Sequence, residues 1–479
     1  MSGRPNVLIF MPDSLRADAV GAFGSRVAHT PNIDALAARG TAFMQTFSQH
    51  SVCSPSRVSM QTGWYPHVGG HRTLDHLIQP WEPSMLRIFS EGGYSVGWVG
   101  RVGDTFAEGL VDDYCDFAGL TVRPQRKEPV TEPHGVLGTT NSFYAGRLEA
   151  GRVDLDEAAT QTAIAWLGEP PPEPWLLFCT LADPHPPFEV ADPWFSMHDR
   201  ASMPDPVPLA DDGKPSFMKL LSDSYELARL ERRDWAEIAA VYHGMVSRVD
   251  DMLGRVLTAL DASGAGERTV IVFHTDHGEY LGDFGLVEKW PSGLDPCLLH
   301  NPLMIAAPGM PAGEQTDALV EMIDVLPTLL ELCELQARHT HFGRSLVALL
   351  TDPTLPHRDA IYAEGGHRTD EPHVLEGSGA PGVYQRKAQL QQDHPEAVGK
   401  AVALRTHAHT YVMRAYEGDE FYDRVADPNE MTNVAGSSPD VERDLRDAML
   451  DWLVTTADVV PWTGDARFDP AVYSRLPDR

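Results

Sequence analysis

Five consecutive residues, Cys53-Ser54-Pro55-Ser56-Arg57, place a thiol, a turn-forming proline and a fixed cation close together. Helix-forming residues follow and Thr62-Gly63 ends the segment, so the thiol is expected at the start of a helix. The positive end of the helix dipole and the free backbone N–H groups there favour an anion, whether a thiolate, an oxyanion or a bound oxyacid. Arg57 can bind a tetrahedral oxyanion through two N–H groups, which a lysine cannot do. Most lone cysteines are inert core thiols, so the rest of the chain must show whether Cys53 is reactive.

Carboxylates and an imidazole follow two apolar runs that are typical of buried strands. Residues 6–11 lead into Asp13, and residues 270–273 lead into His274-Thr275-Asp276-His277-Gly278. Hard divalent cations such as Ca²⁺, Mg²⁺ or Mn²⁺ bind oxygen ligands in such positions. Each segment alone is explained by an ordinary loop cap or a solvated turn. Together with Cys53, three separate segments would have to match one metal-assisted site by chance.

The order of elements that must position these residues predicts a mainly parallel sheet with helices on both faces. Further strands are expected at 94–99, 175–180 and 303–306. A short helix is expected between Thr30, its cap, and Gly40. Apolar residues recur with helical spacing from Ile238 to Leu260, which predicts the longest helix. Strands that alternate with helices indicate an α/β fold, in which ligands bind at the carboxyl ends of strands.

Two breaks divide the chain. Residues 196–235 are polar and contain prolines, and they are expected to form an excursion over the surface. Beyond Asp352-Pro353, glycine-rich loops, short antiparallel strands at 401–411 and 421–423 and a terminal helix at 440–455 are expected. We therefore predict a catalytic α/β domain at 1–351 and a smaller C-terminal subdomain at 352–479.

Composition limits the partners. The 479 residues include 38 Lys and Arg against 69 Asp and Glu, a formal net charge of −31. Such a chain repels nucleic acid and anionic membranes, and no apolar run is long enough to span a bilayer. The five cysteines do not resemble a disulfide framework, and the chain shows no signal peptide. We expect a cytoplasmic protein without nucleic-acid or membrane partners; an exported mature form is the alternative, and a homo-oligomer is left open.

Several of these segments, in the same order, resemble the type I sulfatases, whose active-site cysteine is oxidised to formylglycine. The pattern Cys-x-Pro-x-Arg at Cys53 to Arg57 resembles the signature of that family. Further similar blocks are His29 through Arg57, Thr275 to Glu279 with Gly282 and Lys289, Asp324 to Leu330, and Tyr422-Asp423 with Asp427-Pro428 to Asn433. The likeness spans nearly the whole chain. It implies the alkaline-phosphatase-like α/β sandwich, with a large mainly parallel sheet and a smaller C-terminal α+β subdomain that holds a short antiparallel sheet.

The resemblance implies a metal-binding group and a nucleophile. Asp13, Asp276 and His277 would hold one divalent metal ion, with Ca²⁺ expected first and Mg²⁺ or Mn²⁺ as alternatives. Cys53, oxidised by a formylglycine-generating enzyme, would be the nucleophile and a further metal ligand. The hydrated aldehyde can expel sulfate by returning to the aldehyde, whereas a plain thiol would stop at a covalent adduct.

The resemblance also implies the groups around the sulfate. Arg57 would hold the formylglycine hydrate, and Lys289 would bind the sulfate oxygens. His185 would protonate the leaving oxygen, because an ordinary histidine pKa near neutrality suits a general acid. Arg101 and His71 are expected as additional substrate contacts.

Some positions depart from the family pattern. Many members carry a second acidic residue where this chain has Ser14, and Asp-Asn where it has Asp276-His277. A Gly-Lys-x-His segment is common where Gly100-Arg101-Val102-Gly103-Asp104 stands here. Ser14 and His277 resemble a related branch that hydrolyses phosphonate monoesters and phosphodiesters. The expected function is hydrolysis of a small aryl or carbohydrate-like sulfate monoester; the alternatives are phosphonate monoester or phosphodiester hydrolysis, and a catalytically silent binding protein.

Overall fold

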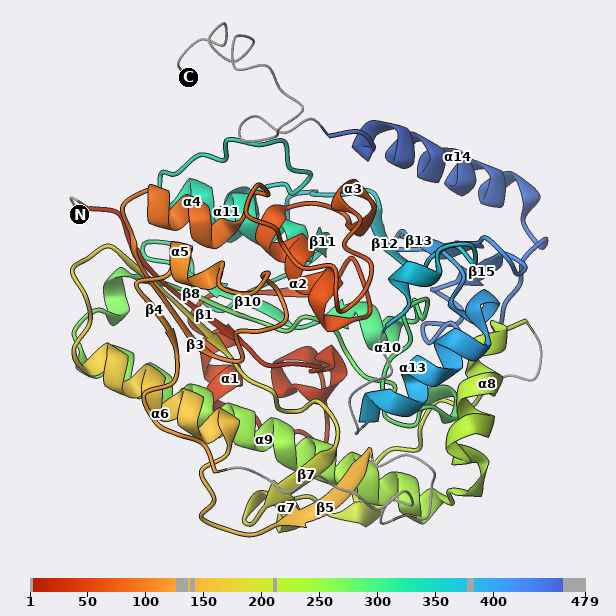
Figure 1. Ribbon diagram of the computed structural model, residues 1–479, viewed down its shortest axis with the longest axis horizontal. Coiled ribbons are helices and arrows are strands. Elements are labelled where there is room, and N and C mark those ends of the chain that lie inside the picture. The colour runs from red at the N-terminus through yellow and green to blue at the C-terminus, as the bar shows by residue number, and fades with distance from the viewer. Residues whose placement is uncertain (1–2, 126–136, 138–142, 210–212, 377–382, 460–479) are drawn as a thin grey trace, which may run out of the picture.

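A large mixed sheet forms the centre of the molecule (Figure 1). The computed structural model describes residues 3–125, 137, 143–209, 213–376 and 383–459. The strand order is β11-β2-β10-β8-β1-β6-β3-β4, with β9 beside β2. These strands are β1 (Asn6–Met11), β2 (Thr41–Phe47), β3 (Ser95–Gly100), β4 (Phe117–Gly119), β6 (Trp175–Thr180), β8 (Thr269–His274), β9 (His300–Asn301), β10 (Leu303–Ala306) and β11 (Glu314–Glu321). The predicted α/β class and its strands are confirmed.

Parallel pairing around β1 brings the site segments together. β1 pairs in parallel with β6 on one side and β8 on the other, so that Val7 lies opposite both Leu176 and Val270. The strand predicted at 303–306, β10, instead runs antiparallel to β8 and β2. Because β1, β6 and β8 point the same way, the loops after their carboxyl ends meet at one edge of the sheet.

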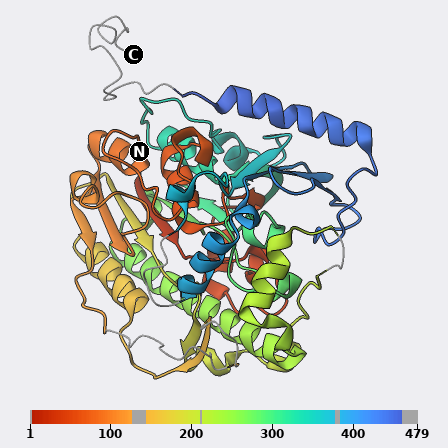
Figure 2. The ribbon, with the colours of Figure 1, turned by 45° about the vertical axis from the view of Figure 1, so that its right-hand side comes forward.

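Helices cover both faces of this sheet, as Figures 1 and 2 show. Alternate residues of β1 point to opposite faces. Leu8 and Phe10 belong to a core with residues of the helices on one face, and Val7 and Ile9 belong to a second core on the other face. The helices are α1 (Pro31–Ala37), α2 (Cys53–Thr62), α3 (Pro66–Gly69), α4 (Met85–Glu91), α5 (Val111–Tyr114), α6 (Leu155–Gly168), α7 (Trp194–Met197), α8 (Ser216–Tyr225), α9 (Arg232–Ala262), α10 (Pro296–Leu299), α11 (Val325–Leu332), α12 (Val347–Thr351), α13 (Val383–Asp393) and α14 (Pro439–Thr456). No helix in the described ranges is long and apolar enough to cross a bilayer.

Two expectations about helices need correction. The segment at 196–235 is not only a surface excursion, because α8 buries Phe217 and Leu221 in the core. Thr30 precedes α1 as predicted, but its side chain makes no capping hydrogen bond. The carboxylate of Asp250 on α9 instead accepts the backbone N–H groups of the first turn of α1 at 2.8 Å. A tertiary contact thus caps this helix.

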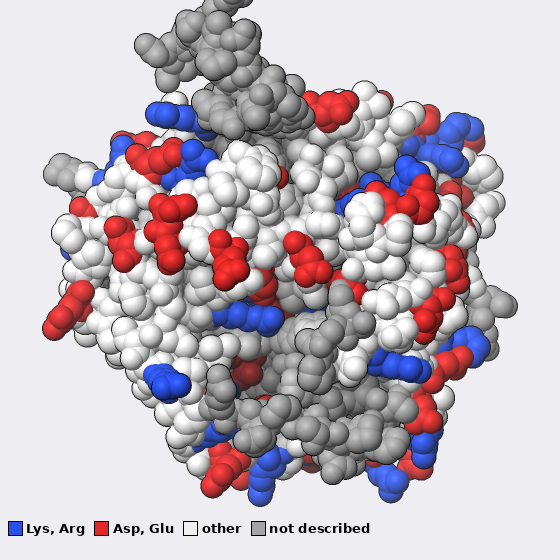
Figure 3. Space-filling model, viewed as in Figure 1, with Lys and Arg blue, Asp and Glu red and all other residues white. Residues whose placement is uncertain are grey.

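The C-terminal part contains a second, antiparallel sheet in the order β12-β13-β14-β15. Its strands are β12 (Ile361–Gly365), β13 (Ala401–Arg405), β14 (His409–Arg414) and β15 (Glu420–Asp423), and β5 (Tyr144–Leu148) pairs separately with β7 (Phe188–Ala191). The predicted strands and terminal helix are confirmed, while the boundary at residue 352 stays a prediction. Arg358 links the two parts through buried ion pairs with Glu321 and Asp324. On the face shown in Figure 3, acidic side chains are widely spread, in agreement with the net charge of −31.

Candidate active site

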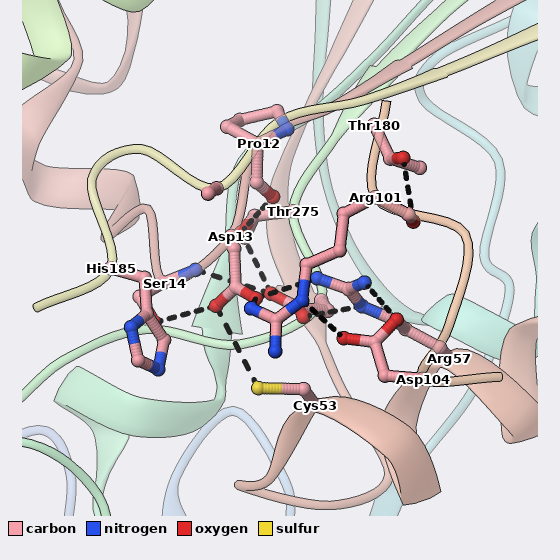
Figure 4. Close-up of polar contacts among 12 residues, drawn as sticks. Pro12, Asp13, Ser14, Cys53, Arg57, Arg101, Asp104, Thr180, His185 and Thr275 are labelled. Carbon is pink, nitrogen blue, oxygen red and sulfur yellow. Dashed lines mark hydrogen bonds and ion pairs between the residues drawn. The ribbon is translucent and has the colours of Figure 1, made fainter. Parts of the chain in front are cut away.

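The loops after β1 and β8 meet the first turn of α2 in a buried cluster (Figure 4). Asp13 follows β1, Asp276 and His277 follow β8, and Cys53 is the first residue of α2. One ligand atom from each of these four side chains lies within 4.8 Å of the other three. All four side chains are buried, with at most 2% of their surface exposed. The structure therefore brings together the four residues predicted to bind the metal.

The donor set of this cluster fits a divalent metal ion. Nδ1 of His277 donates to the carbonyl oxygen of Gly278 at 2.7 Å, so the lone pair of the neutral ring lies on Nε2. Nε2 lies 3.1 Å from Sγ of Cys53, 3.7 Å from Oδ1 of Asp13 and 3.9 Å from Oδ1 of Asp276. The two carboxylate oxygens are ligands that Ca²⁺, Mg²⁺ or Mn²⁺ prefer, whereas the imidazole nitrogen is a ligand more typical of transition metals.

The guanidinium of Arg57 holds three carboxylates. Its Nε donates to Oδ2 of Asp276 at 2.8 Å, Nη2 donates to Oδ2 of Asp13 at 2.6 Å, and Nη1 donates to Oδ1 of Asp104 at 2.7 Å. Only 1% of Arg57 is exposed, and a buried cation is tolerated only when it is paired in this way. Because Arg57 occupies the Oδ2 atoms, the Oδ1 atoms of Asp13 and Asp276 are left facing His277 and Cys53.

Cys53 in its unmodified form is a neutral thiol. Burial, and next the Asp13 carboxylate, raise the pKa of the Cys53 thiol to about 12. These two effects on the thiol pKa are larger than the opposite effect of the helix N-terminus. The sequence had suggested that the helix N-terminus would favour a thiolate. An unmodified Cys53 is therefore a poor nucleophile at neutral pH.

A second group of side chains lies beside the metal cluster. Nζ of Lys289 lies 2.6 Å from Nε2 of His185 and 3.2 Å from the phenolic oxygen of Tyr384. The Tyr384 hydroxyl also contacts Nε2 of His185. Nδ1 of His185 lies 2.6 Å from the carbonyl oxygen of Pro186 and donates to it, so Nε2 accepts.

The protonation of His185 differs from the expectation. Burial, and next the neighbouring Lys289, lower the pKa of His185 well below its usual value. The ring is therefore neutral at neutral pH, and the predicted near-neutral pKa is wrong. A proton donated from Nε2 would first have to arrive from Lys289 or Tyr384, the two donors in contact with it.

The two expected substrate contacts occupy different environments. Arg101 lies at the rim of the site, where Nη1 is 3.8 Å from Asp13 and Nε is 3.2 Å from Asp104, and 35% of its side chain is exposed. His71 uses both ring nitrogens within its own loop, on the carbonyl oxygen of His76 at 2.7 Å and on Glu82 at 3.1 Å. Both roles in substrate binding stay predictions.

Two site residues were missed from the sequence. Asp104 follows the carboxyl end of β3, as Asp13 follows β1, so the same strand-end rule could have indicated it. Tyr384 belongs to α13 in the C-terminal part, and no local pattern connects it with His185. Only the packing of the C-terminal part against the sheet places this phenol in the site.

Comparison with solved structures shows which fold this chain shares. A phosphonate monoester hydrolase of Agrobacterium radiobacter matches with a TM-score of 0.76 and 24% sequence identity, covering 95% of this chain and 96% of that one. This likeness shows that the two proteins share a fold. The expected alkaline-phosphatase-like α/β architecture is confirmed.

Sequence comparisons define the family. The family model described as Sulfatase matches residues 5–335. A sulfatase of Formosa agariphila is 27% identical over 461 residues, covering 91% of this chain and 83% of the relative. The multifunctional alkaline phosphatase superfamily protein PehA of Trinickia caryophylli is 26% identical over 517 residues, covering 95% of this chain and 96% of the relative. The chain belongs to the sulfatase family and is a hydrolase of that family, which confirms the resemblance seen in its sequence.

Proposed function

We propose that this enzyme hydrolyses a small aryl or carbohydrate-like sulfate monoester, with formylglycine derived from Cys53 as the nucleophile. The observation that supports this proposal best is the convergence of Cys53 with the ligand atoms of Asp13, Asp276 and His277 within 4.8 Å. A nucleophile next to a divalent cation is the arrangement that hydrolysis of a stable anionic ester requires.

The residues of the cluster would hold a metal ion and a modified side chain. Asp13, Asp276 and His277 would bind one divalent cation, with Ca²⁺ expected first and Mg²⁺ or Mn²⁺ as alternatives. The cation would polarise a sulfate oxygen, and the formylglycine hydrate would supply the attacking hydroxyl group. Arg57 contacts both carboxylates and stands one helical turn from position 53, where it would hold the formylglycine hydrate.

The cations around the pocket would bind the substrate. Lys289 lies beside the cluster and has an ammonium group that can neutralise the sulfate oxygens in the transition state. Arg101 extends the positive charge to the rim, and His71 is assigned to an outer contact. His185 would accept a proton at Nε2 from Lys289 or Tyr384 and pass it to the leaving oxygen, while its Nδ1 stays bound to a backbone carbonyl.

Phosphonate monoester or phosphodiester hydrolysis is the second candidate. The observation in its favour is the Asp276-His277 pair together with Ser14, whose hydroxyl donates to Oδ1 of Asp13 at 2.8 Å. The Ser14 hydroxyl stands at the position where many sulfatases carry a second acidic residue. The catalytically silent alternative is set aside because the chain belongs to a family of enzymes.

The test starts from protein expressed aerobically with a formylglycine-generating enzyme. Peptide mass mapping should show the aldehyde at position 53, and the converted protein should turn over aryl sulfates. The variant Cys53→Ala should lose that turnover, with metal still bound through Asp13, Asp276 and His277. An unconverted and dispensable Cys53 would end the proposal. Second-order rate constants that favour aryl phosphonates or bis-aryl phosphates by orders of magnitude would establish the second candidate instead.

Three further assignments accompany this proposal. The formylglycine-generating enzyme is the partner during maturation, the chain is placed in the cytoplasm, and a homo-oligomer is left open. The division into domains at 1–351 and 352–479 is tested by limited proteolysis, which should cut the native protein first near residue 352.

A further inference from the structure

Arg248 on α9 is a buried cation to which the proposed chemistry gives no role. Only 7% of its surface is exposed. Its Nη1 donates to Oδ2 of Asp183 at 2.8 Å, and its Nη2 donates to Oδ1 of Asp154 at 2.6 Å. A buried cation is tolerated only with such partners. One of the two partners, Asp183, belongs to the loop that carries His185, so Arg248 reaches the active site through this loop.

The loop after β6 connects Asp183 with two parts of the active site. The backbone N–H of Asp13 donates to the carbonyl oxygen of Asp183 at 3.3 Å, and the backbone N–H of His185 donates to the carbonyl oxygen of Ala182 at 2.9 Å. Asp13 is also held by Arg57, at 2.6 Å. The backbone position of His185 therefore depends on this loop more than the position of Asp13 does.

Three carboxyl groups lie near the guanidinium of Arg248. Asp156 uses its two oxygens on the backbone N–H groups of Ala182 and Asp183, at 2.8 and 2.7 Å. Burial raises the pKa of the Asp183 carboxyl well above its usual value, and Arg248 opposes this rise. Without Arg248, Asp183 would keep Asp154 and Asp156 as neighbours of like charge. Its carboxyl group would then take up a proton or move away from them, and either response disturbs the loop.

We propose that Arg248 is a positioning residue that fixes where His185 stands relative to the leaving oxygen of the substrate. This inference rests on the proposed function. Asp154, the second partner of Arg248, is itself fixed, because its carboxylate caps α6 by accepting the backbone N–H of Glu157 at 3.0 Å. Arg248 thus ties the loop to two helices, α6 and α9, that pack against each other. Displacing a catalytic group by about 1 Å can cost about 10²-fold in rate.

The test is a series of aryl sulfates with graded phenol pKa, measured on converted Arg248→Met. For the poorest leaving groups, kcat/KM should fall by about tenfold or more beyond the fall for the best ones, mainly through kcat. Arg255→Met is the matched control, because Arg255 lies about two helical turns further along α9 and binds Glu157 of α6 at 2.8 and 2.7 Å. This control should change kcat/KM by less than about threefold for every ester.

The partner of Arg248 is tested in the same series. Asp183→Asn nearly keeps the shape of the side chain and removes its charge, so it should give the same dependence on the leaving group. Adding Arg248→Met to it should change that dependence by less than about threefold, since both variants break one ion pair. Independent effects that multiply in the double variant would overturn the proposal. So would an equal loss on all esters in Arg248→Met, or no loss. If Arg248→Met does not fold by circular dichroism, an unchanged dependence in Asp183→Asn overturns it.

A signal from His185 itself separates this inference from the proposed function. If the converted enzyme cleaves no aryl sulfate, the proposed function is refuted. Nitrogen NMR of histidine-labelled protein then reports the surroundings of the His185 ring, whose signal is assigned by its absence in His185→Ala. Arg248→Met should shift this signal, and Arg255→Met should leave it in place. A signal that Arg248→Met does not shift would overturn the positioning role.

Discussion

Replacing His185 with alanine should separate substrates according to their leaving groups. In the structure, Nε2 of His185 accepts from both Lys289 and Tyr384, so these two donors are the source of any proton that the ring delivers. Poor leaving groups, such as phenols of high pKa, need that proton when the ester bond breaks. Good leaving groups, such as nitrophenols, depart as anions without it.

The expected magnitude has two parts. Losing general acid catalysis costs about 10²–10⁴ in rate, but only for esters that need protonation. Removing the ring also leaves Lys289 and Tyr384 without their shared acceptor. The penalty for the unsatisfied donors is about 1–3 kcal/mol of free energy, and it is the same for every substrate. We therefore expect kcat/KM to fall by about 10²–10⁴ more for the poorest leaving groups than for the best ones.

The assay is a series of aryl sulfates with graded phenol pKa values, measured on protein of known aldehyde content. The plot of log kcat/KM against phenol pKa should become steeper in His185→Ala. Tyr384→Phe is the control, because it removes one donor and keeps the imidazole. Because one hydrogen bond is lost, kcat/KM should fall by about two- to tenfold for every substrate. The slope of log kcat/KM against phenol pKa should not change. Parallel lines for His185→Ala and the unaltered enzyme would refute the general-acid role.

Three further changes probe the groups that hold the site together. Asp276→Ala should lower bound metal, measured by atomic emission, together with activity, since one of four clustered ligand atoms is lost; unchanged metal content would show that the ligand assignment is wrong. Asp104→Asn removes one carboxylate from Arg57 and should raise turnover of dianionic phosphate monoesters relative to aryl sulfates by about tenfold, because a like charge near the pocket is gone; an unchanged ratio would contradict this. Asp156 accepts two backbone N–H groups, at 2.8 and 2.7 Å, at the base of the loop that carries His185. Asp156→Ala should therefore lower kcat/KM more for poor leaving groups than for good ones, as His185→Ala does, but by a smaller factor. An equal loss of kcat/KM on all esters would indicate that Asp156 has only a structural role.

Much of the fold could be predicted from local patterns. Apolar runs indicated the strands, and helical spacing between Ile238 and Leu260 indicated α9. Parallel strands place their carboxyl ends at one edge, which is why Asp13 and Asp276 could be expected near one another before any coordinates were known. The direction of β10, the burial of α8 and the capping of α1 by Asp250 could not be predicted, because each depends on a partner distant in the chain.

The sequence by itself determined which residue types enter the site: a cysteine at a helix start, carboxylates after strands and an arginine one turn on. Tertiary structure alone decided their chemical state and their remaining neighbours. Burial keeps Cys53 a neutral thiol and His185 a neutral ring, and packing of the C-terminal part brings Tyr384 to His185. The physical reason is that desolvation and Coulomb interactions depend on what surrounds a group in space, whereas a motif records only its neighbours along the chain.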